Sequence, residues 1–299
     1  MNKNEVLLTV AKVFKRLPFR SFGRSFNAHR HSSISTAIEP LCDQAVREMN
    51  DSGVDVRFEE AVNDGPIWVF WWQGLDNAPD LVRYCVNTIN THAGHRRVIV
   101  IDKNNIHEYA TLPRQIFDLV DSGAITLTHL SDLLRFNLLY NYGGLWMDST
   151  LLCTSSLDAI HTETLFTCSG FYDSTWFNVS RGRWTGFLIG GPAGDPLFRF
   201  MDSFFMIYWK TNEELIDYFL IDYALNYAWK HNIGGFHEAC IRNEGNQPHL
   251  FDLHLNQSLN SYQWQSLIAS TIVFKLSYKK VSTSQLNALN QIRELDIKE

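Results

Sequence analysis

From Pro66 onward, short apolar runs alternate with amphipathic stretches, and this alternation limits the fold more than any other feature of the sequence. Ile67 to Trp72 is a continuous run of β-branched and aromatic residues, which is typical of a parallel strand buried on both faces. A helix is expected to begin at Ala78-Pro79-Asp80, because proline suits the first helical turn, and Val98 to Ile101 is expected to form the next strand. Strands that alternate with helices predict an α/β fold with an open, mostly parallel sheet flanked by helices.

The same pattern continues through the next fifty residues. Helices are expected over Leu112 to Val120 and Ser131 to Tyr142, and a short strand over Ile125 to Leu130. The glycine pair Gly143-Gly144 permits a tight turn into a further strand, Leu145 to Met147.

The second half of the chain is less regular. Asp195-Pro196 is a good cap and first turn for a helix through Lys210. Glu213 to His231 is predicted to form a second helix, apolar nearly all round and therefore buried. Tyr218, Asp222 and Asn226 recur every four residues along it and form one polar stripe.

Charge is distributed unevenly along the chain. The net charge is −6, but the first 36 residues carry seven Lys or Arg against one acidic residue, which leaves −12 on the remainder. The overall negative charge argues against a nucleic-acid binder. The basic residues 1–36, with interleaved phenylalanines, are expected either to lie on an anionic membrane surface or to form a plain tail. Five widely spaced cysteines favour buried thiols in a reducing compartment and hence a cytoplasmic protein, peripheral on the inner membrane if the membrane interpretation holds.

Polar residues follow three of the expected strands. In open α/β sheets, ligands bind beyond the carboxyl ends of the strands, so these residues are candidates for a site. They indicate a nucleotide or another phosphate-bearing ligand. The candidates are Gln73 to Asp76, Asp102 to Asn105 and Asp148 to Thr150.

The segment from Ser131 to Thr150 is the most informative. Ser131 is predicted to cap the helix, which places Asp132 and Arg135 on one side of its first turn. Asp148 then emerges at the end of the following strand.

This segment resembles the nucleotide-sugar-binding core of glycosyltransferases with the GT-A fold, whose pattern runs Ser-Asp-x-x-Arg, Gly-Gly and Asp-x-Asp. It is more similar to the capsular polysaccharide synthesis protein family, in which the last motif tends to be Asp-Ala-Thr. Other segments that match lie in order along the chain: Ile67 to Gly74, Arg183 to Phe187, Asp217 to Tyr223 and Phe274 to Lys279. The resemblance implies a GT-A-like domain over residues 61–285, preceded by a basic and helical segment over 1–60 and followed by a tail over 286–299.

The resemblance also implies a reaction, the transfer of a hexose from a nucleotide-sugar donor to a glycan or lipid-linked glycan in capsular or extracellular polysaccharide synthesis. Uridine diphosphate is the commonest donor nucleotide of the resembled families. A divalent ion, Mn²⁺ or Mg²⁺, is implied on Asp148, although Thr150 stands where the second Asp of the motif would be. That replacement leaves open a second interpretation, a catalytically inactive GT-A-like partner in a polysaccharide-assembly complex.

Candidate roles follow residue by residue. Asp148 and Thr150 are assigned to metal or donor phosphate, and Asp132 and Arg135 to the donor sugar or phosphate, with an internal ion pair between them as the alternative. Asp222 is predicted to be a catalytic carboxylate, with a buried Asp satisfied by a Tyr or Arg side chain as the alternative, and Asp132 is a second catalytic candidate. The remaining donor-site candidates are Trp71, Trp72, Gln73, Asp102, Lys103 and Asn104, and those for the acceptor side are Trp184, Thr185 and Gly186.

Overall fold

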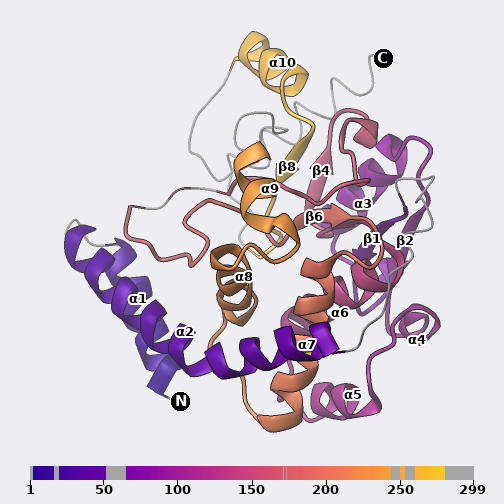
Figure 1. Cartoon of the computed structure of the whole chain (residues 1–299). Coiled ribbons are helices and arrows are strands. Elements are labelled where there is room, and N and C mark those ends of the chain that lie inside the picture. Colours follow the sequence, from indigo (N-terminus) through magenta and orange to yellow (C-terminus); the bar gives the residue numbers. More distant parts are fainter. Residues whose placement is uncertain are drawn as a thin grey trace.

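A computed structural model describes residues 3–16, 20–51, 65–170, 172, 174–243, 250–252 and 260–279. The predicted tail over 286–299 lies outside the described residues. The chain folds into a central sheet covered by helices on both faces, with a smaller sheet beside it (Figure 1).

The central sheet has five strands in the order β2-β1-β3-β6-β5. β1 pairs in parallel with β2 on one side and with β3 on the other, whereas β6 runs antiparallel to both β3 and β5. β6 is therefore the one strand of this sheet that runs against the others, which confirms the predicted open, mostly parallel sheet. The strands are β1 (Ile67–Phe70), β2 (Val98–Ile101), β3 (Gly144–Met147), β5 (Phe166–Thr167) and β6 (Leu188–Gly191).

Alternate side chains of each central strand enter different cores, as the two-residue period of a strand requires. Trp68 and Trp146 face a large core formed with α2 (Arg20–Asp51), α6, α7 and α8, whereas Ile67 and Leu145 face a smaller core formed with α3 and β4 (Leu151–Cys153). All four residues are at most 1% exposed. Burial on both faces explains why these strands are apolar runs without a polar side. The helices are α3 (Asp80–His92), α4 (Ile106–Tyr109), α5 (Arg114–Asp121), α6 (Leu127–Tyr142), α7 (Pro196–Thr211), α8 (Leu220–Lys230), α9 (Phe236–Asn243) and α10 (Ser261–Ala269).

The turn from α6 into β3 depends on glycine. Gly143 and Gly144 both have positive φ, 64° and 94°. A Cβ at Gly144 would collide with the carbonyl oxygen of Pro66, the residue that precedes β1. The pair thus lets β3 lie directly against β1 and brings Asp148 to the carboxyl end of the sheet.

The second sheet extends the carboxyl end of β3. β4 (Leu151–Cys153) follows β3 after three residues and pairs antiparallel with β8 (Val273–Lys275), which also pairs in parallel with β7 (Leu250–Asp252). Lys275 lies opposite Leu151 in this register. β8 is thereby brought next to the segment Asp148–Thr150.

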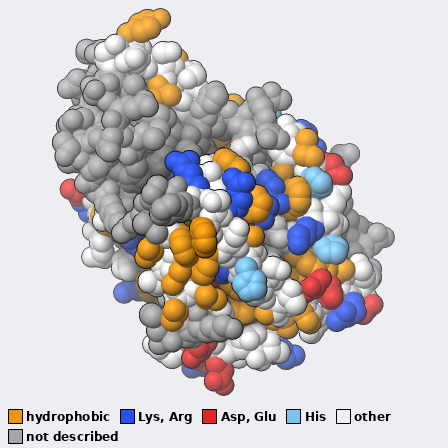
Figure 2. All heavy atoms as spheres, turned by 90° about the vertical axis from the view of Figure 1, so that its left-hand side faces the viewer, with side chains coloured by type: hydrophobic (Ala, Val, Ile, Leu, Met, Phe, Trp, Pro, Cys, Tyr) orange, Lys and Arg blue, Asp and Glu red, His pale blue; other side chains and the backbone are white. Residues whose placement is uncertain are grey.

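Two N-terminal helices, α1 (Lys3–Arg16) and α2 (Arg20–Asp51), precede the sheet. α2 packs against α7 and α8, and its Ile34, Ile38 and Cys42 are buried in the large core. Lys and Arg side chains gather across the face of the molecule at the left of Figure 1, with apolar side chains beside them (Figure 2). Among the described residues, no helix has the length and apolar character needed to cross a membrane.

Three local predictions were wrong. Ile125 to Leu130 is not a strand, because α6 already begins at Leu127 and is capped by Thr126, whose side chain accepts a hydrogen bond from the His129 amide. Ser131 is consequently not the cap, and Asp132 lies in the second turn of α6. The helix expected from Glu213 begins only at Leu220. Just before it, the Asp217 side chain accepts a hydrogen bond from the Phe219 amide.

Candidate functional site

A cavity of about 590 Å³ opens at the carboxyl ends of β1 and β3, where the sheet position predicts a ligand. Its walls come from the loop after β1, the first turns of α6, the loop after β3, and β8 with the residues that follow it. The lining residues are Phe70, Trp71, Trp72, Gln73, Asn77, Pro79, Leu127, Thr128, Ser131, Trp146, Asp148, Ser149, Thr150, Tyr218, Lys275, Tyr278 and Lys279.

Asp148 is at the centre of a polar network in this cavity. Its Oδ1 accepts a hydrogen bond from Trp146 Nε1 at 3.0 Å and faces Arg135 Nη2 at 3.5 Å. Its Oδ2 accepts from Lys275 Nζ at 2.8 Å. Burial alone raises the pKa of Asp148, but the charges of Lys275 and Arg135 outweigh it and hold the pKa below the ordinary value of the carboxyl. Asp148 is therefore ionised at neutral pH.

Lys275 also donates to Thr150 Oγ1 at 2.9 Å, so one ammonium bridges the two residues predicted to hold a metal ion. The same ammonium lies 4.9 Å from the centre of the Phe187 ring. A divalent ion prefers several oxygen ligands at about 2.0–2.6 Å. Here the Asp148 carboxylate and the Thr150 hydroxyl already accept hydrogen bonds from the Lys275 ammonium. Among the described residues, no group of three or more His, Cys, Asp or Glu side chains could hold a metal ion. This donor set does not fit a tightly bound divalent ion.

Asp132 and Arg135 form an ion pair behind Asp148. Arg135 Nη1 donates to Asp132 Oδ1 at 3.1 Å, and the guanidinium stacks over the Trp146 ring at 5.0 Å. On the other side, His129 Nδ1 lies 3.6 Å from Asp132 Oδ2. His129 Nε2 accepts from Trp209 Nε1, which can only donate, so the imidazole proton lies on Nδ1 and faces Asp132. Arg135 thus connects the carboxylates of Asp132 and Asp148.

Asp222 lies close to this ion pair, at the start of α8. Its Oδ1 accepts from Trp184 Nε1 at 2.9 Å. Burial, reinforced by the charge of Asp132, raises the pKa of Asp222 to about 6. Gly186 lies directly against the Arg135 guanidinium, since a Cβ there would lie 3.1 Å from Arg135 Nη1. A carboxyl group with a pKa raised toward neutral pH is a candidate acid or base, although Asp222, like Asp132 and Arg135, is not itself among the residues that line the cavity.

Several predicted donor residues do line the cavity, and others do not. Trp71, Trp72 and Gln73 belong to its wall, and the Trp71 ring meets the edge of Tyr278 at 5.3 Å. Asp102 instead closes its own loop by accepting the backbone amides of Asn104 and Asn105 at 2.7 and 3.3 Å. Neither Asp102 nor its two followers, Lys103 and Asn104, is among the lining residues.

The predicted acceptor residues lie behind the cavity surface. Trp184 and Thr185 are 1% and 5% exposed. Thr185 Oγ1 contacts Cys168 Sγ at 3.2 Å, and Trp184 holds Asp222. Their side chains therefore position other groups, and a direct contact of either with an acceptor sugar stays a prediction.

Sequence reasoning missed four residues of this site. Lys275, Tyr278 and Lys279 lie in a segment that resembles the family but to which the sequence assigns no role. Tyr218 was recognised only as part of a polar stripe, yet it lines the cavity, and its pKa is raised by burial and by the charges of Asp132, Asp148 and Asp222. In the sequence, Lys275 stands out only as a basic residue inside the segment Phe274 to Lys279. Nothing there indicates which acidic residue it contacts.

Comparisons with known proteins complete this description. The family described as capsular polysaccharide synthesis protein matches residues 15–294. The glycosyltransferase afumC of Aspergillus fumigatus (strain CBS 144.89 / FGSC A1163 / CEA10) is 30% identical over 151 residues, which cover 46% of this chain and 38% of that protein. This chain thus matches well under half the length of that curated relative. Among solved structures, the PaToxG glycosyltransferase aligns with 87% of this chain and 98% of its own, at 12% identity and a TM-score of 0.37.

Proposed function

Because the chain belongs to the capsular polysaccharide synthesis protein family, we propose that it is a GT-A-like glycosyltransferase that moves a hexose from a nucleotide-sugar donor to a glycan or lipid-linked glycan. The observation that carries the proposal is the cluster of Asp148, Lys275 and Arg135, of which Asp148 and Lys275 line an aromatic cavity at the carboxyl ends of β1 and β3. The name of the partial fungal relative, a glycosyltransferase, supports the same reaction class.

The donor nucleotide would bind between the loop after β1 and the segment after β8. Trp71, Trp72 and Tyr278 offer aromatic faces for a base, and Gln73 offers an amide for its polar edge. The diphosphate would then meet the ammonium groups of Lys275 and Lys279, which line the same cavity. We take uridine diphosphate as the donor nucleotide to test first.

The sugar would lie toward Arg135, Asp132 and Asp222. In the proposed step an acceptor hydroxyl attacks the anomeric carbon, the bond from that carbon to the phosphate oxygen breaks, and its electron pair leaves with the diphosphate. Asp222 takes the proton of the hydroxyl, a role that suits a carboxyl with a pKa of about 6 because it is mostly ionised at neutral pH. The developing charge on the diphosphate is neutralised by Lys275.

A divalent metal on Asp148 and Thr150 stays a prediction, and no step above depends on it. Lys275 supplies a positive charge between these two side chains, which favours donor binding without an added ion.

The first experiment is isothermal titration of the protein with nucleoside diphosphates, with and without Mn²⁺ and with excess chelator. We expect one nucleotide, uridine diphosphate first, to bind in the presence of chelator. Lys275→Gln should weaken that binding roughly tenfold or more through the loss of a charge-assisted contact. Lys210→Gln is the matched control, because Lys210 is an exposed lysine at the end of α7.

Two outcomes would contradict different parts of the proposal. Nucleotide binding that appears only with Mn²⁺ would contradict the metal-independent role of Lys275 and assign that role to a metal ion, while leaving the proposed transferase in place. Failure of the folded protein to bind any nucleotide would favour the catalytically inactive partner of a polysaccharide-assembly complex.

We also propose a cytoplasmic location at the inner membrane face. All five cysteines are free and buried, which is the state expected in a reducing compartment.

A further inference from the structure

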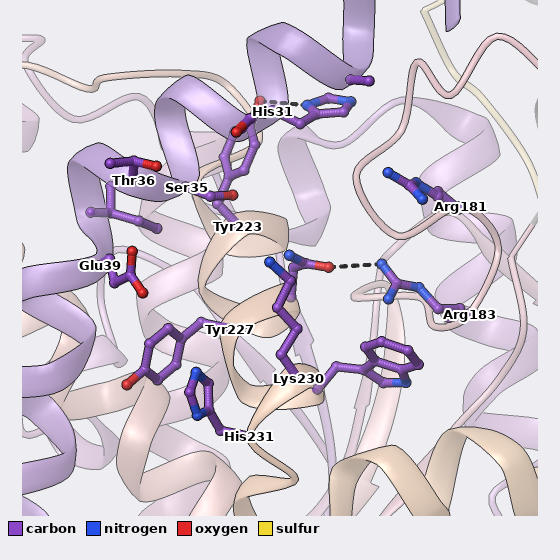
Figure 3. Close-up of a pocket in the computed structure, with 15 residues that line it drawn as sticks. His31, Ser35, Thr36, Glu39, Arg181, Arg183, Tyr223, Tyr227, Lys230 and His231 are labelled. Atoms are coloured by element: carbon purple, nitrogen blue, oxygen red, sulfur yellow. Dashed lines mark hydrogen bonds between the residues drawn. The ribbon is translucent and has the colours of Figure 1, made fainter. Parts of the chain in front are cut away.

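A second cavity, of about 500 Å³, lies between α2, α8 and the segment that carries Arg181 and Arg183 (Figure 3). It shares no lining residue with the cavity around Asp148. Both cavities nevertheless lie near α8, since Tyr218, two residues before the start of this helix, lines the first cavity and Tyr223 lines the second.

The charge of this second cavity is unbalanced. Arg181, Arg183 and Lys230 line it, with Glu39 as the acidic residue of the lining. The Arg181 guanidinium stacks on the Trp176 ring at 3.7 Å, and among the described residues neither it nor the Lys230 ammonium has a hydrogen-bond or ion-pair partner. Both side chains extend into the space in front of α2 (Figure 3). Two cationic groups are therefore available for a ligand.

Arg183 is held in a fixed orientation at the back of the cavity. Its guanidinium lies between the rings of Trp184 and Trp229, at 4.4 and 4.2 Å, and donates to Asn226 Oδ1 at 2.8 Å. Burial lowers its pKa to about 10, so the group stays charged at neutral pH. Asn226, the third residue of the predicted polar stripe, thus serves this cavity and not the one around Asp148.

His31 and Tyr223 line the cavity as an uncharged, hydrogen-bonded pair. The Trp176 carbonyl at 2.8 Å accepts from His31 Nε2, so His31 Nδ1 accepts from the Tyr223 hydroxyl at 2.8 Å. Burial lowers the pKa of His31 to about 4, and the imidazole is uncharged at neutral pH. His31 therefore adds no positive charge to that of the two arginines and the lysine.

The rest of the lining suits a sugar. Ser32, Ser35 and Thr36 of α2 offer hydroxyl groups, which can exchange hydrogen bonds with sugar hydroxyls. The rings of Tyr227 and Trp229 also belong to the lining, but they are packed against protein groups: Tyr227 against Phe200 and His231, and Trp229 against Arg183 and His237.

We propose that this cavity binds the phosphate or carboxylate group of an anionic saccharide, with Arg181, Arg183 and Lys230 as the cationic contacts. The saccharide part of the proposal rests on the proposed function, whereas the anion part rests on the charge of the cavity alone.

The test is titration of the full chain with inorganic phosphate, glucose 6-phosphate, glucuronate and neutral glucose. The anionic sugars are expected to bind, inorganic phosphate to bind more weakly, and glucose not to bind. The double variant Arg181→Gln, Lys230→Gln should weaken binding of the anionic sugars by roughly tenfold or more. Lys210→Gln and Lys275→Gln should leave that binding unchanged, because neither residue lines this cavity.

Two results would overturn the inference. The first is that the anionic sugars do not bind. The second is that their binding survives the double variant and is lost in Lys275→Gln, which would place the binding site in the first cavity. Titration of the same variants with uridine diphosphate separates this failure from that of the proposed function, because nucleotide binding should persist when Arg181 and Lys230 are replaced.

Discussion

At the scale of single residues, the candidate site depends on buried charges whose environments differ. Asp148 is surrounded by cations and stays ionised, whereas Asp222 is buried beside another carboxylate and its pKa rises to about 6. Neighbouring carboxyl groups with such different pKa values can take separate roles, one in binding and one in proton transfer.

Asp222→Asn tests this difference. We expect donor hydrolysis and transfer to fall roughly 10²- to 10⁴-fold, because the amide cannot take a proton. In the parent protein, activity should rise with pH through about 6 as Asp222 ionises.

Stability should change in the opposite direction. The pKa of Asp222 is higher in the folded than in the unfolded chain, so its stabilising contribution is complete below pH about 4 and is lost as pH rises through about 6. At pH 8 the neutral Asn should therefore raise the free energy of unfolding by about 1–3 kcal/mol. Asp202→Asn is the matched control, because burial also raises the pKa of Asp202 to about 6 on α7. It should stabilise the protein without loss of activity, and equal loss of activity in both variants would contradict the role of Asp222.

The buried ion pair of Arg30 with Asp217 gives a second residue-scale prediction. The two side chains are 1% and 0% exposed, and their nearest atoms are 2.5 Å apart. Arg30→Met leaves the buried Asp217 carboxylate without its ion-pair partner. We therefore expect the free energy of unfolding, measured in urea, to fall by about 3–5 kcal/mol. The double variant Arg30→Met, Asp217→Asn should recover part of it, and a single-variant loss below about 1 kcal/mol would show that the pair contributes little.

At the scale of elements, the position of Asp148 depends on the turn between α6 and β3. Gly144→Ala should destabilise the protein by about 3 kcal/mol or more, because its Cβ would meet the backbone of Pro66, and it should weaken nucleotide binding by displacing Asp148. Gly123→Ala is the control, since Gly123 also has positive φ, 82°, but its Cβ would meet nothing within 4 Å. Gly123→Ala should lower the free energy of unfolding by about 1–2 kcal/mol, the backbone cost of a positive φ alone, as measured by thermal unfolding. Equal losses in the two variants would mean that backbone strain, and not the close approach of the strands, explains both.

At the scale of the whole molecule, the positive charge of the first 36 residues is opposed to the negative charge of the rest. α1 and α2 lie at one side of the fold (Figure 1), and their Val13 and Phe22 are 54% and 72% exposed. This combination is typical of a segment that lies on an anionic membrane surface.

Flotation with vesicles tests the membrane prediction. We expect the protein to bind vesicles that contain phosphatidylglycerol, to bind neutral vesicles weakly, and to be released as salt rises and screens the charges. Lys12→Glu combined with Phe22→Ser should reduce binding, whereas Lys210→Glu should not. Binding that ignores salt and both variants would contradict an electrostatic contact through α1 and α2. These substitutions are preferable to removal of the first 37 residues, which would also delete Arg30 and Ile34 from the core.

The sequence by itself determined most of the local structure. Apolar runs predicted β1, β2 and β3, the Asp195 cap predicted the start of α7, and the glycine pair predicted the turn that leads to Asp148. Such features depend on neighbours within a few residues, where period and backbone preference act directly. The wrong start of α6 shows the limit of this reasoning, since Thr126 and Ser131 are both good caps and packing of the first turn decides between them.

Tertiary structure alone decided which charged groups meet. Lys275 contacts Asp148 from 127 positions away, through the pairing of β8 with β4, and no local pattern specifies that partner. The second cavity likewise joins α2 to α8 and to Arg181 and Arg183. Contacts across such separations depend on how buried faces pack together, because the fold must bury each apolar face and pair each buried charge at once. The sequence therefore predicts helices and strands, whereas only the folded structure shows that Lys275 is the cation beside Asp148.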